Sequence, residues 1–236
     1  MENKLIRIAI DGPAGAGKTT ISKRLAAELG IDRIDTGAMY RAIALKLART
    51  GVDYNDADAL AGLLDSTELD FGGGHVLLDG EDVEGFIRTP EISELASASS
   101  TVLAIREKLV AMQREIGRRK SVVMDGRDIT TNVLPFAEYK FYLTASAAER
   151  ARRRALEYLE KLQPESGESM EAFEERKQLW LKENLPLIEE EIETRDYRDM
   201  HREHNPLTIA GDAIVVDSSD LSIPEVVEKM LSCIRK

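Results

Sequence analysis

The sequence contains little of what marks secreted and membrane proteins. Cys233 is the only cysteine among 236 residues, which excludes a disulfide framework and favours a reducing compartment. No apolar run approaches the length of about 20 residues that a membrane span needs. The amino-terminal stretch MENKLIRIAI lacks a secretory pattern. We therefore expect a cytoplasmic protein that has no membrane partner.

Positive charge is also scarce, since 43 acidic residues outnumber 32 lysines and arginines and the net charge is −11. Nucleic acid is not an expected partner, because binding it needs a broad basic face. With one cysteine and three histidines, a zinc site is not expected either. Arginines are nevertheless concentrated locally, which suggests small anionic ligands held in a cleft. The two stretches hold Arg150, Arg152, Arg153 and Arg154, and then Arg195, Arg198 and Arg202.

What the sequence does contain is a strand, a glycine-rich loop and a helix in direct succession. An apolar run over residues 5–10 predicts a buried strand, and helical spacing of apolar residues continues to Leu29 before Gly30 ends the helix. The loop between them fits G-x-x-x-x-G-K-[ST] at every fixed position. Its backbone N–H groups and the helix N-terminus would hold a phosphate chain. The residues expected to bind a nucleoside triphosphate are Gly12, Pro13, Ala14, Gly15, Ala16, Gly17, Lys18, Thr19 and Thr20.

Two side chains of this loop carry chemistry. Lys18 can reach the β- and γ-phosphates, and the Thr19 hydroxyl can ligate Mg²⁺. A glycine-rich turn with a stray lysine is the alternative reading, and the agreement of strand, loop and helix disfavours it.

Strands and helices alternate along most of the chain. This pattern predicts a three-layer α/β fold of the P-loop type, with a five-stranded parallel sheet covered by helices on both faces. A Ser222-Ile-Pro-Glu225 capping box predicts the last helix. The further core strands are expected at residues 31–35, 121–124, 140–143 and 213–216, and the helices between them at residues 38–50, 55–66 (with Asn55 as its cap) and 93–119.

Two segments depart from this alternation. Short apolar runs around Asp79-Gly80, a type I′ turn signal, predict a small antiparallel insert over residues 67–90. Further along, a capping box at Ser146 opens an arginine-rich helix. A polar loop over residues 161–171 and a long charged helix over residues 172–201 follow it, and Pro186 is expected to kink or interrupt that helix.

Three features address what accepts a phosphoryl group. Asp35–Arg41 ends a strand and begins a helix, which offers a hydroxyl and a guanidinium, and an ordinary helix cap is the alternative interpretation. Asp125–Asp128 follows another strand, where ligands bind in such sheets, and could hold a phosphate, an amine and metal-bound water. Arg195, Arg198, Asp199 and Arg202 share one helix face, either around an anion or as a salt-bridge lattice with the preceding glutamates.

Many anion donors and no clear general base favour an acceptor that is itself a phosphate monoester, which is mostly dianionic at pH 7 because its second pKa is about 6. Asp35 is the one good candidate for a base, so a kinase of a small hydroxyl compound stays open. A nucleotide-binding switch is disfavoured, because the sequence has no [NT]-K-x-D motif.

At this point the chain resembles the bacterial cytidylate kinases, almost from end to end. The segments that carry the resemblance are IAIDGPAGAGKTT, DTGAMYRA, LDGEDVEGFIRTPEIS, MDGRD, ASAAERARRR, RDYRD and VVDSSDLSIPEVVEKM. The resemblance implies phosphoryl transfer from ATP to CMP or dCMP with Mg²⁺, in pyrimidine nucleotide metabolism, by a monomer. A kinase of UMP or AMP is the neighbouring alternative. The implied domains are a core over residues 1–66, 100–150 and 203–236, a monophosphate-binding insert over 67–99 and a helical lid over 151–202.

The resemblance also implies roles for individual residues. Thr36 would stand near the acceptor phosphate, Ser97 and Arg106 would contact the cytosine ring, and Asp128 would accept a hydrogen bond from the cytosine amino group. The chain departs from the family after Asp128, where Ile129–Asn132 replaces the usual Gly-Thr pair. The implied CMP-binding set is Thr36, Tyr40, Arg41, Ser97, Arg106, Arg127, Asp128, Arg195, Asp199 and Arg202; the catalytic set is Lys18, Arg127, Arg153, Arg154 and Arg195; and Thr19 and Asp125 hold Mg²⁺, the latter through water.

Overall fold

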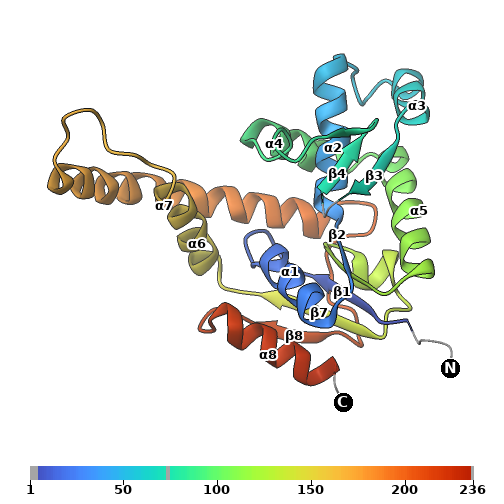
Figure 1. Cartoon of the computed structure of the whole chain (residues 1–236). Helices are drawn as coiled ribbons and strands as arrows, with labels where there is room; N and C mark the ends of the chain where they lie inside the picture. The colour runs from blue at the N-terminus through green and yellow to red at the C-terminus, as the bar shows by residue number, and fades with distance from the viewer. Residues whose placement is uncertain (1–4, 73–74, 235–236) are drawn as a thin grey trace.

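A parallel five-stranded sheet forms the centre of the computed structural model, which describes residues 5–72 and 75–234. All neighbouring strands in this sheet pair in parallel (Figure 1), so the predicted architecture is confirmed. The order across the sheet is β2 (Asp32–Asp35), β6 (Val122–Gly126), β1 (Arg7–Asp11), β7 (Tyr139–Thr144) and β8 (Ile214–Asp217).

Helices cover both faces of the sheet. On one face, α2 (Thr36–Thr50), α3 (Ala57–Asp65) and α5 (Leu103–Arg119) pack in a core cluster with Ala9. On the other, α1 (Lys18–Leu29) and α8 (Ile223–Ile234) pack with Ile8 and Ile10. Successive strand residues point to opposite faces. The uninterrupted apolar run of β1 therefore supplies buried side chains to the cores on both faces of the sheet.

The insert is a second, smaller sheet next to α2. Its strands β3 (Leu69–Gly72), β4 (His75–Leu78) and β5 (Glu81–Asp82) pair antiparallel, and α4 (Pro90–Ser99) follows (Figure 1). Asp79 and Gly80 both have positive φ, 51° and 84°, which confirms the predicted type I′ turn. Gly73 and Gly74, also placed in the insert by the sequence, lie outside the described residues.

A helical hairpin reaches away from the sheet. It consists of α6 (Ala147–Leu159) and α7 (Met170–His201), which pack through buried apolar side chains (Figure 1). The predicted interruption at Pro186 is wrong, since α7 is continuous. Leu185 and Ile188 on either side of the proline pack in this seam, and that packing keeps both halves of the helix together. Among the described residues, none of the helices combines the length and apolar character needed to cross a bilayer.

Two other predicted boundaries are wrong for local reasons. The helix expected over residues 93–119 is broken between α4 and α5, where the Ser100 and Thr101 hydroxyls each donate to a backbone carbonyl three residues earlier. Such bonds compete with the helical ladder. The cap of α3 is Asp56, which accepts from the N–H groups of Asp58 and Ala59, whereas Asn55 donates to Asp53.

Two helical glycines provide a test of this packing. A Cβ at Gly62 in α3 meets nothing within 4 Å, whereas a Cβ at Gly117 in α5 would lie 2.4 Å from Leu134 Cδ2. We expect Gly62→Ala to raise the free energy of unfolding by about 0.5–1 kcal/mol, because alanine is the better helix former. Gly117→Ala should lower it on balance, since overpacking costs about 1–3 kcal/mol. Urea denaturation followed by circular dichroism measures both, and a gain for Gly117→Ala would contradict the packing described.

Candidate active site

One cavity of about 990 Å³ opens at the carboxyl ends of the central strands. This volume lies at the upper end of the range of about 300–1,000 Å³ usual for a small-molecule site. Its wall is built from the glycine-rich loop, the start of α2, the end of β6, α4, α6, α7 and the connection from β8 to α8. Of the residues predicted to bind nucleotides, those on this wall are Ala14 to Thr20, Thr36, Tyr40, Arg41, Ser97, Asp125, Arg127, Asp128, Arg153, Arg195, Asp199 and Arg202.

The glycine-rich loop begins where the chain leaves β1. Gly12 has a φ of +151°, and a Cβ there would lie 1.9 Å from the Leu143 carbonyl oxygen of β7, so only glycine fits this close approach. Gly12 and Pro13 do not line the cavity but accept hydrogen bonds from Lys18 Nζ at 2.6 and 2.7 Å. Burial and the charge of Arg127 lower the pKa of Lys18. A phosphate beside Lys18 would supply the counter-charge that its buried ammonium lacks.

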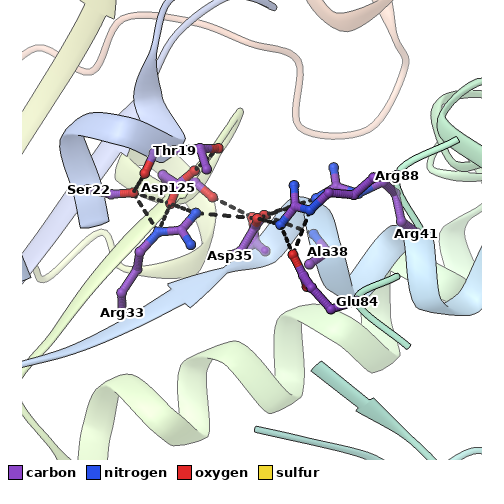
Figure 2. Close-up of polar contacts among 10 residues, drawn as sticks. Thr19, Ser22, Arg33, Asp35, Ala38, Arg41, Glu84, Arg88 and Asp125 are labelled. Carbon is purple, nitrogen blue, oxygen red and sulfur yellow. Dashed lines mark hydrogen bonds and ion pairs between the residues drawn. The ribbon is translucent and has the colours of Figure 1, made fainter. Parts of the chain in front are cut away.

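Thr19 and Asp125 meet at the base of the cavity. Thr19 Oγ1 lies 3.5 Å from Asp125 Oδ2, while Asp125 Oδ1 accepts from Ser22 and Arg33 at 2.7 and 3.0 Å (Figure 2). Burial and the charge of Asp35 raise the pKa of this carboxyl group. Two oxygen donors next to a phosphate loop fit Mg²⁺, which completes its octahedron with water and substrate phosphates.

Asp35, at the end of β2, is surrounded by arginines. Its carboxylate lies 3.3 Å from both Arg33 and Arg41 and 3.5 Å from Arg88, and it also caps α2 by accepting from the Ala38 N–H (Figure 2). Burial alone would raise the pKa of Asp35, but the charges of Arg41 and Arg33 and the Ala38 hydrogen bond lower it. This environment holds the proton-free form, so Asp35 is a poor general base.

Asp128 forms the centre of a buried charged cluster on the insert side. Arg106 Nη2 donates to Asp128 Oδ2 at 2.6 Å, and Arg202 Nη2 lies 3.0 Å from the other carboxylate oxygen. Arg106 is 1% exposed and its guanidinium lies 6.0 Å from the centre of the Tyr40 ring. Arg106 therefore stands behind the wall and acts on the cavity through Asp128.

A second pair connects β6 to α7. Arg127 Nε donates to Asp199 Oδ2 at 2.6 Å. Arg195, one turn earlier on α7, has an Nε with no hydrogen-bond partner among the described residues. Burial and the charge of Arg127 lower the pKa of Arg195 to about 10. Two arginines thus face the same part of the cavity with one carboxylate between them, which leaves an excess of positive charge.

Of the remaining arginines that the sequence singled out, Arg153 lines the cavity, whereas Arg154 and Arg198 do not. Arg198 instead donates to Ser97 Oγ and Glu94 of α4, both at 3.0 Å. Arg153 lies on the wall and donates to the Ser218 carbonyl and hydroxyl. Arg154 is not on the wall; its guanidinium lies over the ring of Tyr158, so its implied contact with ATP stays a prediction.

Sequence reasoning missed several residues of the site. Asp11 ends β1 and accepts from the Ile129 and Thr130 N–H groups and the Thr130 hydroxyl at 2.6–2.9 Å. It thereby holds the π-helical turn η1 (Ile129–Val133) that follows Asp128, where the sequence departs from the family. An aspartate at the end of a strand was a usable signal. Wall residues that the sequence did not assign to the site include Arg88, Glu149, Arg152, Glu157 and residues 218–223, although Arg152 was noted as part of an arginine cluster and Ser222 as a helix cap.

The glycine-rich loop at the carboxyl end of a parallel sheet, together with an arginine-lined cavity, defines a P-loop α/β protein that binds phosphates. The family model for cytidylate kinase matches residues 8–236, and the chain belongs to the cytidylate kinase family.

Curated relatives agree along the whole length. The cytidylate kinase of Caldicellulosiruptor bescii is 47% identical over 237 residues, covering 99% of this chain and 97% of the relative. That of Lactobacillus johnsonii is 46% identical over 238 residues, covering 99% and 96%. Among solved structures, an uncharacterized protein from Eubacterium ventriosum superposes with a TM-score of 0.50 at 14% identity, over 98% of this chain and 99% of that one, which supports the fold alone.

The Asp128 cluster predicts a large stability effect. Asp128→Asn would leave the side chains of Arg106 and Arg202, 2% and 5% exposed, without their counter-charge. Breaking a buried pair costs about 3–5 kcal/mol, so we expect a loss of that order in the free energy of unfolding. Glu81→Gln is the matched control, because its partner Arg49 is 40% exposed and such surface pairs contribute about 0–1 kcal/mol. Equal losses in urea titrations would contradict the cluster's description.

Proposed function

We propose that the chain transfers the γ-phosphoryl group of ATP to CMP or dCMP, giving ADP and CDP or dCDP. The observation that carries this proposal is a single cavity with a phosphate loop on one wall and Asp128 on another, where Arg106 holds Asp128 from behind. Arg127 and Arg195 line the same cavity. Family membership supports the same reaction.

The donor phosphates would lie on the loop, where backbone N–H groups and the start of α1 favour anions. Lys18 would exchange its bonds to two backbone carbonyls for bonds to the β- and γ-phosphates. When bound by Thr19, Asp125, water and phosphate oxygens, Mg²⁺ would neutralise charge on the transferred group. Because phosphoryl transfer depends chiefly on positioning and charge neutralisation, Arg127, Arg195 and Arg153 would complete the catalytic set by contacting the reacting phosphates.

The acceptor would bind with its base towards α4 and its phosphate towards α2. The Asp128 carboxylate can accept from an exocyclic amine, which cytosine has and uracil lacks, and Arg106 holds that carboxylate in place. Ser97 offers a hydroxyl to the same ring. Arg195 and Asp199 would hold the ribose, and the groups around the acceptor phosphate would be Thr36, Tyr40, Arg41, Arg127 and Arg202.

No protein base is required for this acceptor. Three arginines keep Asp35 ionised and occupied, which disfavours a hydroxyl acceptor that would need a base there. We also expect the chain to act as a monomer, as its resemblance to the family implies. We place it in the cytoplasm, in pyrimidine nucleotide metabolism.

An acceptor panel tests the proposal directly. With MgATP and a coupled assay of ADP release, CMP and dCMP should exceed UMP, AMP and GMP in kcat/KM by at least about tenfold per lost hydrogen bond to the base, a 1.4 kcal/mol difference. Ser97→Ala should raise KM for CMP and leave KM for ATP unchanged, because of the two nucleotides only the acceptor would contact that hydroxyl. A lead for UMP or AMP would reject the assignment of Ser97, Arg106 and Asp128 to the cytosine.

The acceptor also fixes the expected pH profile. Asp35 has a lowered pKa, so it stays ionised from pH 5 to 8 and contributes no step in that window. The phosphate of CMP, with a second pKa of about 6, gains a proton as the pH falls and becomes a weaker nucleophile. We therefore expect kcat/KM for CMP to fall about tenfold per pH unit below about pH 6. A profile whose step does not move when the acceptor phosphate is replaced by a more acidic phosphorothioate would contradict this origin.

A further inference from the structure

Two buried charged residues behind the phosphate loop have no part in the proposed reaction. Asp196 lies on α7 and Arg150 on α6, with exposed fractions of 7% and 6%. Arg150 Nη1 donates to Asp196 Oδ2, so the two side chains neutralise each other. Both stand outside the described cavity wall, and a role for them must therefore act through other residues.

Both side chains hold the backbone of the same loop residue. The Ala14 N–H donates to Asp196 Oδ1 at 2.9 Å, and the Ala14 carbonyl accepts from Arg150 Nη1 at 2.8 Å. The peptide groups on either side of Ala14 are therefore held by one residue from each helix of the hairpin, Arg150 from α6 and Asp196 from α7. Because the orientation of peptide groups decides where a phosphate loop aims its N–H donors, this pair sets the geometry of the ATP site from behind.

The neighbouring glycine brings the helices into contact with the loop. Gly15 has a φ of +75°, and a Cβ there would lie 3.2 Å from Arg150 Cβ and 3.7 Å from Ile192 Cδ1. Ile192 is fully buried in the seam between α6 and α7. No space remains between the loop and this seam at Gly15, so a displacement of either helix must also displace the loop.

The same face of α7 reaches the acceptor side of the cavity. Ile192, Asp196 and Asp199 follow one another at helical spacing and share that face. Asp199 accepts from Arg127 at the end of β6, and the adjacent Arg195 lines the cavity. One continuous helix therefore contacts the loop that would hold ATP and the residues that would hold the acceptor.

We propose that the Arg150–Asp196 pair couples the phosphate loop to the acceptor site through α7, so that bound CMP tightens the binding of ATP and bound ATP tightens that of CMP. The inference rests on the proposed function of the cavity. Reciprocity follows from linkage: if the acceptor biases the position of α7, and that position fixes Ala14, each ligand must change the affinity of the other by the same factor. Arg150 and Asp196 are positioning residues.

Calorimetry with a non-hydrolysable ATP analogue and Mg²⁺, with and without saturating CMP, measures this factor. In the parent protein we expect CMP to tighten analogue binding at least about 5-fold, the lower end of usual coupling factors. Asp196→Asn keeps the side-chain shape but removes its charge, and should reduce the factor below about 2-fold. The matched control is Glu168→Gln, which breaks the 2.8 Å pair with Arg176 on the same helical hairpin and should keep the parental factor.

Arg150→Met releases the loop from the α6 side and should give the same loss. The double variant should lose little more than either single variant, because the pair acts as one unit. Thermal unfolding checks that each variant is folded, and either single variant suffices for the test. A parental factor retained in a folded Asp196→Asn or Arg150→Met protein would reduce the pair to a structural role and overturn the inference. So would a parent protein that binds CMP without any effect on the analogue. A parent that neither binds nor phosphorylates CMP would reject the proposed function first.

Discussion

The structure depends on burying guanidinium groups, which cannot lose their charge as a lysine or histidine can. Each buried arginine around the cavity therefore needs a fixed negative partner, and the strand ends and α7 provide them. Arg33 pairs with Asp125, Arg106 with Asp128, and Arg127 with Asp199. These pairs determine which way the arginines point before a ligand arrives, and an arrangement fixed in advance costs little reorganisation during phosphoryl transfer.

The pairing is incomplete at two arginines. The Nε atoms of Arg41 and Arg195 have no hydrogen-bond partner among the described residues, and burial lowers the pKa of both groups. A lowered pKa on an arginine means that its charged form is under-compensated, and a phosphate is the ligand that would supply the missing charge. The chain as a whole carries a net charge of −11, so the under-compensated charge of these two arginines contrasts with an acidic protein overall.

The sequence predicted the layers well because their causes are local and repeated. Alternating strand and helix patterns, the loop motif and the Asp79-Gly80 turn each specify their own structure. The errors arose where side chains compete with the backbone, as at Ser100 and Thr101, or where packing overrides propensity, as at Pro186. Neither effect produces a periodic pattern of residues, so the reading of strand and helix periods does not detect it.

The site was predictable to the extent that its residues sit in motifs. Most of the predicted nucleotide-binding residues reach one cavity, although their individual roles stay predictions. The hydrogen bonds that join Ala14 to Asp196 and to Arg150 connect residues 182 and 136 positions apart in the chain, respectively. A single sequence gives no signal for contacts between residues so far apart. Arg198 illustrates the converse: it shares the predicted face spacing with Arg195 but turns to α4, because the insert lies within its reach.

The central claim is that one cavity holds donor and acceptor together, with the arginines around their joined phosphates. A compound that links adenosine and cytidine through a chain of five phosphates tests it most directly, by titration calorimetry with Mg²⁺. The account predicts one molecule bound per chain, more tightly than either nucleotide alone, and displaced by ATP and by CMP separately. Displacement by only one of the two nucleotides, or two molecules bound per chain, would contradict it.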